Sequence, residues 1–171
     1  INKFNYHFNR ESKKLKPERI YEEDDYIKKL NSYLFSEPDH IIDNIYLGNG
    51  NNAANINTIN KYNIKFIINV TKELDNYFDP DINYFKCELL DEKENNISNF
   101  FPKIIEIFNE NKENNILIHC FMGSSRSAVM VLLYLIKFKN MTLEDSLNFL
   151  KEKRSIVNIN VEFINQLKEF I

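Results

Sequence analysis

The chain has 171 residues, with 22 Lys and Arg against 25 Asp and Glu, so its formal charge is −3 at pH 7. This length favours one domain with a short extension, and 43% hydrophobic residues are enough for a core. The slight negative charge, without a basic stripe interleaved with aromatic residues, gives no reason to expect a nucleic-acid partner. The longest uninterrupted apolar run, residues 128–136, is too short to span a bilayer, so no membrane segment is expected.

The N-terminal part of the chain has the character of an extension. Residues 1–16 are polar and hold a small basic cluster, either a solvated tail or a docking site for an acidic partner: Lys13, Lys14 and Lys16. From Pro17, a favoured first helical residue, apolar residues at helical spacing predict a helix that packs on the main domain: Ile20, Ile27, Leu30 and Leu34. Pro38 marks the predicted boundary, so residues 1–40 form the extension and residues 41–171 the main domain.

The main domain alternates predicted strands with predicted helices. The apolar runs predict strands at residues 41–47, 64–70, 84–89 and 116–119. Helical spacing of apolar residues predicts helices at residues 53–59, 97–108, 126–138 and 142–150. This alternation predicts an α/β fold, with a mainly parallel central sheet flanked by helices and a functional site at the C-terminal end of a strand.

One stretch joins a predicted strand to a predicted helix and contains the candidate catalytic residues. The strand delivers Cys120 to a turn, and the helix leaves from about Arg126. Backbone N–H groups of this turn can point at one bound anion, and the helix dipole adds to their attraction. The Cys120 thiol is expected to ionise easily there and to act as a nucleophile.

Phosphate is the anion that suits this turn. It offers several acceptor oxygens to a ring of N–H donors, the Arg126 guanidinium can close the ring with a bidentate fork, and Gly123 supplies backbone freedom. The residues expected to bind phosphate are Phe121, Met122, Gly123, Ser124, Ser125 and Arg126. A buried structural cysteine beside an incidental arginine is the plain alternative. A nucleotide-binding P-loop is excluded, because Gly-Lys-Ser/Thr is absent from the turn.

The string His-Cys-x-x-Gly-x-Ser-Arg-Ser, residues 119–127, resembles the signature of the cysteine-dependent protein phosphatases, and most closely their dual-specificity branch. Residues 44–48 and 67–71 resemble the opening of such a domain. The resemblance implies the fold of that family and a protein phosphatase that hydrolyses phosphotyrosine and phosphoserine or phosphothreonine. It implies a phosphoprotein as partner, with neither cofactor nor metal.

The resemblance also implies roles for individual residues. Asp91 matches the general acid of the family, and Glu92 and Glu94 are neighbouring competitors for that role. Cys120 would form a phosphocysteine intermediate, and Arg126 would stabilise charge on the transferring oxygens.

Two further residues of the loop have implied roles, with structural roles as the alternatives. Ser127 would donate to the sulfur as it leaves, and His119 would orient the loop beneath Cys120. Two other functions remain open: a phosphatase of phosphoinositides, carbohydrates or RNA 5′ phosphates, and a phosphopeptide-binding pseudophosphatase.

The chain has two cysteines, Cys87 and Cys120. Because a nucleophilic Cys120 has to stay reduced, the two cysteines favour a protein in the cytoplasm or nucleus over a secreted domain stabilised by disulfides. Cys87 lies at the end of the predicted strand that leads to the loop of residues 90–98, which holds Asp91 (the acid loop). It is either a small buried residue or a resolving thiol that forms a reversible disulfide with Cys120.

Overall fold

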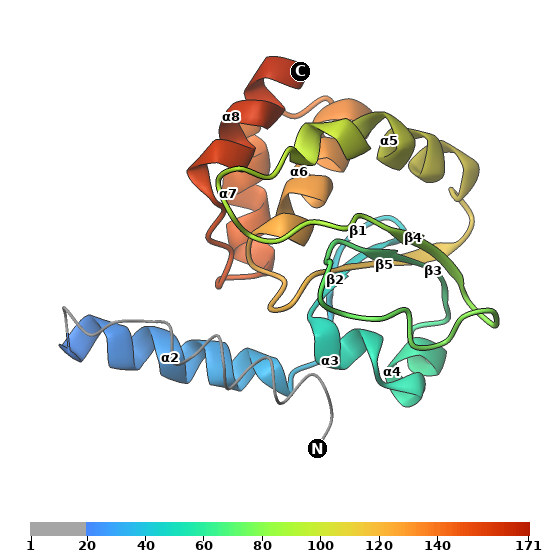
Figure 1. The fold of residues 1–171 in the computed structure, drawn as a ribbon, viewed down its shortest axis with the longest axis horizontal. Helices are drawn as coiled ribbons and strands as arrows, with labels where there is room; N and C mark the ends of the chain where they lie inside the picture. The colour runs from blue at the N-terminus through green and yellow to red at the C-terminus, as the bar shows by residue number, and fades with distance from the viewer. Residues whose placement is uncertain (1–19) are drawn as a thin grey trace.

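A computed structural model describes residues 20–171 and shows a five-stranded sheet with helices on both faces (Figure 1). The strands are β1 Asp39–Ile42, β2 Ile45–Gly48, β3 Ile64–Asn69, β4 Asn83–Lys86 and β5 Asn115–His119. Their order is β1-β2-β5-β3-β4, and only the β1–β2 pair is antiparallel. The predicted α/β class with a mainly parallel sheet is thus confirmed.

The helices divide between the two faces of the sheet. Those below it in Figure 1 are α3 Gly50–Ala53 and α4 Ile56–Lys61. Those above it are α5 Phe101–Glu110, α6 Arg126–Lys139, α7 Leu143–Lys153 and α8 Val161–Phe170, with the short 3₁₀ helix η1 Ile97–Phe100 before α5. An N-terminal helix, α2 Ile20–Leu34, extends from the side of the domain. Lys13, Lys14, Lys16 and Pro17 lie outside the described residues.

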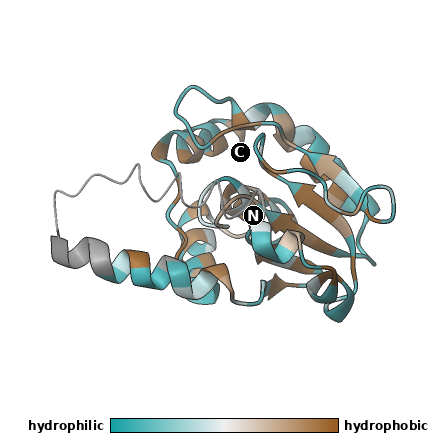
Figure 2. Cartoon of the chain, turned by 60° about the horizontal axis from the view of Figure 1, so that its bottom comes forward, coloured by the Kyte–Doolittle hydropathy of each residue, from teal (hydrophilic) through white to brown (hydrophobic). Residues whose placement is uncertain are grey.

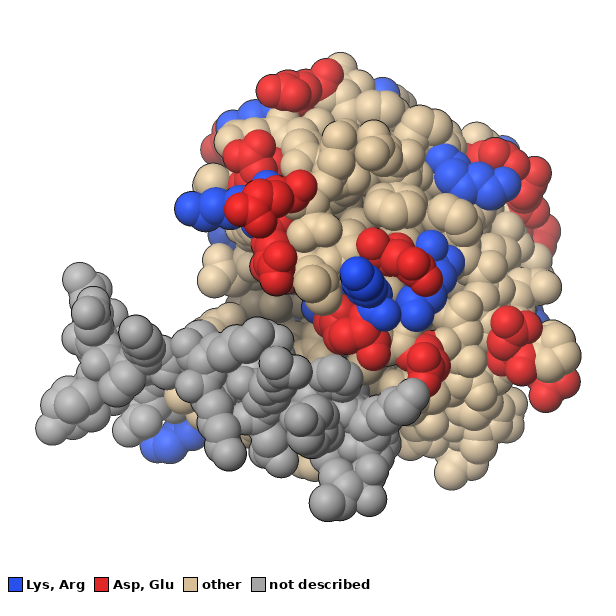
Figure 3. Space-filling view, in the orientation of Figure 1, with Lys and Arg blue, Asp and Glu red and all other residues tan. Residues whose placement is uncertain are grey.

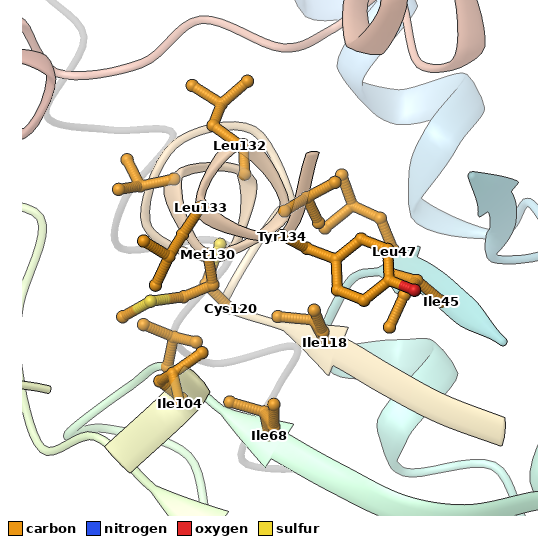
Figure 4. Packing of buried hydrophobic residues seen from close by; sticks show 14 of the residues in the cluster. Ile45, Leu47, Ile68, Ile104, Ile118, Cys120, Met130, Leu132, Leu133 and Tyr134 are labelled. Carbon is orange, nitrogen blue, oxygen red and sulfur yellow. The ribbon is translucent and has the colours of Figure 1, made fainter. Parts of the chain in front are cut away.

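The core forms because the central strands are apolar on both faces. Along β5, Ile116 and Ile118 face the large core under α5, α6 and α8, whereas Leu117 faces the small core under α3 and α4. This alternation follows from the two-residue period of a strand. Figure 4 shows Ile118 and Ile68 beneath the apolar side chains of α6, and Figure 2 shows the apolar strands between more polar outer surfaces.

Helix α6 is the central helix of the large core. Its residues 126–135 are all buried, so it is covered on every side by the sheet and its neighbouring helices. None of the helices in residues 20–171 combines the length and the apolar character needed to cross a membrane. On the face shown in Figure 3, basic side chains of the described residues lie among acidic ones.

Three element predictions need correction. The single strand predicted at 41–47 is a hairpin, because Asp43 adopts a left-handed conformation (φ 48°) and Asn44 completes a two-residue turn. The single helix predicted at 53–59 is two helices, because the Asn55 side chain caps a new start by accepting from the N–H groups of residues 57 and 58. The strand predicted at 84–89 runs from Asn83 to Lys86.

Candidate functional site

The predicted phosphate-binding loop, residues 120–126 (the phosphate loop), lies where β5 ends and α6 begins, at the C-terminal edge of the parallel strands. Cys120 leaves the sheet with only 3% of its surface exposed. Arg126 is the first residue of α6, and the helix directs its positive dipole end toward the loop. The structure therefore brings the predicted nucleophile and the predicted anion-binding arginine together at a helix N-terminus.

Every carbonyl of residues 121–124 accepts a hydrogen bond from a donor outside the loop. The donors are Gly50 N to Phe121 O (3.0 Å), Arg154 Nη2 to Met122 O (2.9 Å), Arg154 Nε to Gly123 O (2.8 Å) and Asn158 N to Ser124 O (2.9 Å). In a trans peptide the C=O and the following N–H point in opposite directions. The N–H groups of residues 122–125 are consequently turned away from these donors, toward the inner side of the loop.

The sulfur of Cys120 receives two donors. The Gly123 N–H donates to Sγ at 3.2 Å, and the Ser127 hydroxyl donates to Sγ at 3.1 Å. Gly123 has a φ of +71°, where a side chain would be strained, and an added Cβ would also collide with the Gly48 carbonyl. The sulfur is therefore held by one backbone donor of the loop and one side-chain donor from the first turn of α6.

Arg126 keeps one edge of its guanidinium unused. Its Nη1 and Nη2 donate to the two carboxylate oxygens of Glu73 at 2.9 and 2.7 Å, and Nη1 also donates to the Leu89 carbonyl at 3.1 Å. Nε, although buried, has no partner among the described residues. Because a guanidinium has five N–H donors, the Nε–H and the second Nη2–H remain, and these two form the side-on fork that matches two phosphate oxygens.

The charges around Arg126 reinforce one another. Burial alone lowers the pKa of the guanidinium, but the charges of Cys120 and Glu73 and the hydrogen bonds to Glu73 raise it overall. Arg126 therefore stays cationic. Glu73 lies 53 residues before Arg126 in the chain, and no local sequence pattern marks it as part of the site.

The structure brings Asp91 to the loop. Its Oδ1 accepts from the Ser125 hydroxyl at 3.2 Å and from the Asn160 amide at 3.4 Å, while the residue itself stays exposed. The neighbouring Glu92 and Glu94 are exposed, and their side chains make no such bond to the loop. The Asn160 N–H also donates to Ser125 Oγ at 3.0 Å, so the segment after α7 joins the acid loop to the phosphate loop.

His119 lies fully buried directly before the cysteine. Its Nδ1 is 3.1 Å from the Cys120 carbonyl, which can only accept, so Nδ1 carries the hydrogen. Burial lowers the pKa of the imidazole from 6.5 to about 4. His119 is therefore neutral at pH 7, and it holds the backbone of Cys120 by a hydrogen bond rather than by charge.

Cys87 is fully buried, and burial raises the pKa of its thiol to about 12. A thiol with this pKa stays protonated at neutral pH, which favours the structural alternative over a resolving thiol. Residues 20–171 hold no group of three or more His, Cys, Asp and Glu side chains placed to bind a metal ion.

The family model described as "Dual specificity phosphatase, catalytic domain" matches residues 45–171. The chain belongs to the dual specificity phosphatase family. The family inferred from the loop signature is thus confirmed.

Relatives of this dual specificity phosphatase domain include two curated proteins. It is 35% identical over 139 residues to human "Dual specificity protein phosphatase 9", covering 79% of this chain and 36% of that protein. It is 38% identical over 136 residues to a "Probable rhodanese domain-containing dual specificity protein phosphatase" of Dictyostelium discoideum, covering 78% and 29%. The chain thus spans about a third of the length of these relatives.

Solved structures share the fold of the domain. One is the human tyrosine phosphatase-like serine/threonine/tyrosine-interacting protein, with a TM-score of 0.75, 26% identity, and 78% of this chain and 95% of that chain covered. Another is DUSP15, with a TM-score of 0.74, 28% identity, and 78% and 86% covered. Helix α2 precedes the matched residues 45–171.

The lowered pKa of His119 predicts a pH-dependent stability. Between pH 6.5 and about 4 the unfolded chain takes up a proton that the folded chain does not, so the free energy of unfolding falls as the pH falls through this window. The loss attributable to this group reaches roughly 3 kcal/mol. Urea unfolding of wild type and His119→Asn at pH 7 and pH 4 should show the wild-type advantage shrinking by up to this amount. Parallel pH profiles would contradict it.

Proposed function

We propose that this domain is a protein phosphatase that hydrolyses phosphotyrosine and phosphoserine or phosphothreonine through a phosphocysteine intermediate. The observation that carries the proposal is the arrangement around one sulfur. Inward-facing N–H groups, the free fork of Arg126 and the Cys120 thiol converge where a phosphate with three free oxygens would sit.

The first step forms the phosphocysteine. The Cys120 thiolate attacks phosphorus, the bond from phosphorus to the side-chain oxygen breaks, and Asp91 protonates that oxygen as it leaves. Asp91 is suited to this role because it is exposed, where a substrate can reach it, and hydrogen-bonded to the loop residue Ser125. Arg126 and the loop N–H groups stabilise the charge on the transferring oxygens.

The second step restores the thiolate. Asp91 takes a proton from water, the water oxygen attacks phosphorus, and the bond from sulfur to phosphorus breaks to release inorganic phosphate. Ser127, 3.1 Å from Sγ, donates to the sulfur as its negative charge returns. No step uses a metal.

Two further residues act through the catalytic ones. Glu73 holds the ends of the Arg126 guanidinium so that its side edge faces phosphate. His119 holds the Cys120 carbonyl and so fixes the start of the loop. We assign both as positioning residues.

The composition of the loop favours a singly phosphorylated protein side chain. Residues 121–125 contain neither Lys nor Arg, which a lipid or inositol substrate with several phosphates would need for charge neutralisation. The relatives named as protein phosphatases support the same class of substrate.

A phosphopeptide-binding module without turnover is the second candidate. It is favoured by the likeness to the solved structure of the human tyrosine phosphatase-like serine/threonine/tyrosine-interacting protein. Such a module would keep the N–H cradle and bind phosphopeptide without releasing phosphate.

Turnover separates these two candidates. The full chain should release phosphate from p-nitrophenyl phosphate and from a phosphotyrosine peptide, with unchanged rates in EDTA. Cys120→Ser should abolish release and still bind the phosphopeptide, because the cradle is made of backbone. Absence of release from wild type, with peptide binding equal to that of Cys120→Ser, would establish the binding module instead. Loss in EDTA with recovery on adding a divalent ion would contradict the mechanism.

Asp91 is tested by comparing leaving groups. A serine alkoxide leaves far less readily than nitrophenolate and depends more on protonation. Asp91→Asn should therefore lower kcat on phosphoserine peptides by about 10² to 10⁴-fold, and clearly less on p-nitrophenyl phosphate. The alkaline limb of the pH–rate profile should disappear. Glu92→Gln is the matched control and should leave both rates unchanged; equal losses on both substrates in Asp91→Asn would rule out the acid role.

Glu73 is tested by removing its charge while keeping its size. If it positions Arg126, Glu73→Gln should lower kcat/KM by about 10- to 100-fold, the scale for a misplaced catalytic group. Glu88→Gln is the matched control, because Glu88 is exposed. A rise in activity would show instead that Glu73 competes with phosphate for Arg126.

A further inference from the structure

Helix α2 ends against the elements that hold the phosphate loop. Side-chain amides at the start of α3 donate to its last carbonyls: Asn49, the N-cap of α3, donates to Tyr33 O at 2.9 Å and to Leu34 O at 3.3 Å, and Asn51 donates to Leu34 O at 3.1 Å. Figure 1 shows α2 running from the side of the domain toward α3. Leu34 is 5% exposed and clusters with Leu74 and the loop residue Phe121.

The second contact of α2 is with a fully buried arginine. Arg154 has no exposed surface, and its three donor nitrogens are all used: Nε on Gly123 O, Nη2 on Met122 O, and Nη1 on the Asp39 carboxylate at 2.8 Å. The ring of Tyr33 lies over this guanidinium, with its centroid 4.9 Å from Cζ. The Tyr33 hydroxyl also lies 3.1 Å from the Ser155 hydroxyl.

We propose that Tyr33 is a positioning residue of the phosphate loop, which makes α2 part of the catalytic unit. Tyr33 acts through Arg154. The guanidinium holds two loop carbonyls outward and thereby turns the N–H groups of Gly123 and Ser124 inward, the first of them onto the Cys120 sulfur. The proposal rests on the proposed function only in taking the loop to bind the phosphate of a substrate.

The physical reason for the ring is the burial of a cation. Arg154 lies out of water, and its partner carboxylate on Asp39 is 30% exposed. An aromatic face attracts a guanidinium and also excludes water from it. Without the ring, water reaches that face and competes with the loop carbonyls for the same N–H donors, so the two peptide groups lose their fixed orientation.

The primary measurement is the alkylation of Cys120, which requires no turnover. The rate of reaction with iodoacetamide is followed from pH 4 to pH 9 on the full chain, with the modified cysteine identified by peptide mapping. Inward N–H groups stabilise the thiolate. Loosening them should move the midpoint of the alkylation profile to higher pH and slow the reaction at pH 6 by about 3- to 10-fold.

The variants separate the effect of the Tyr33 ring from that of the rest of helix α2. Tyr33→Leu keeps an apolar side chain without the aromatic face and should show the full shift, together with a lower kcat on p-nitrophenyl phosphate. Tyr33→Phe keeps the ring, loses the contact with Ser155, and should react like wild type. Phe35→Ala is the matched control, because Phe35 is an aromatic residue of the same chain segment with 79% of its surface exposed.

The outcomes distinguish the possible failures. A lowered melting temperature in Tyr33→Leu with an alkylation profile that overlays wild type would show that Tyr33 serves stability alone, and would overturn the proposal. Equal shifts in Tyr33→Leu and Phe35→Ala would also overturn it. If wild type releases no phosphate but the Tyr33→Leu profile shifts, the proposed function fails and the positioning role stands.

Discussion

The site depends on the hydrogen bonds that four consecutive loop carbonyls accept on the outer side of the loop. Their donors come from the start of α3, from Arg154 at the end of α7 and from the segment before α8. Because each peptide group is planar, fixing the oxygen on one side fixes the N–H on the other. The inner face of the loop, which carries the N–H groups, is thus fixed by hydrogen bonds on its outer side, and these require no bound anion.

Two buried arginines, Arg126 and Arg154, make different contacts at this loop. Each is paired with one carboxylate, Arg126 with Glu73 and Arg154 with Asp39. Arg154 directs its remaining donors at loop carbonyls, whereas Nε of Arg126 has no partner among residues 20–171. A buried cation without such a carboxylate and carbonyls would be strongly destabilising, so the pairing allows two positive charges to lie beside one small loop.

The acid loop and the phosphate loop meet through a third segment. Ser125 donates to Asp91 and accepts from the Asn160 N–H, and the Asn160 amide donates to the same carboxylate oxygen. Neither loop belongs to a regular element, so their mutual position rests on these polar contacts and on the core beneath them. These contacts hold the Asp91 carboxylate beside Ser125 of the loop.

The sequence alone determined the family and the class of fold. It also predicted that Cys120, Arg126 and Ser127 lie together, because the three are within eight residues of one another where a strand, a turn and a helix meet. Local spacing is enough to place side chains that share one such unit. The hairpin at β1–β2 escaped prediction, because the turn residues Asp43 and Asn44 interrupt an apolar run by only two positions.

Only the tertiary structure decided what surrounds that unit. Glu73 lies 53 residues from Arg126, Arg154 lies 31 from Gly123, and Asn160 lies 35 from Ser125. A charged or amide residue on its own leaves no periodic trace in the sequence, because its partner is chosen by the packing of distant elements. The same holds for Tyr33, because the spacing of Ile27, Leu30 and Leu34 predicts the helix that contains it but not the buried guanidinium beneath its ring.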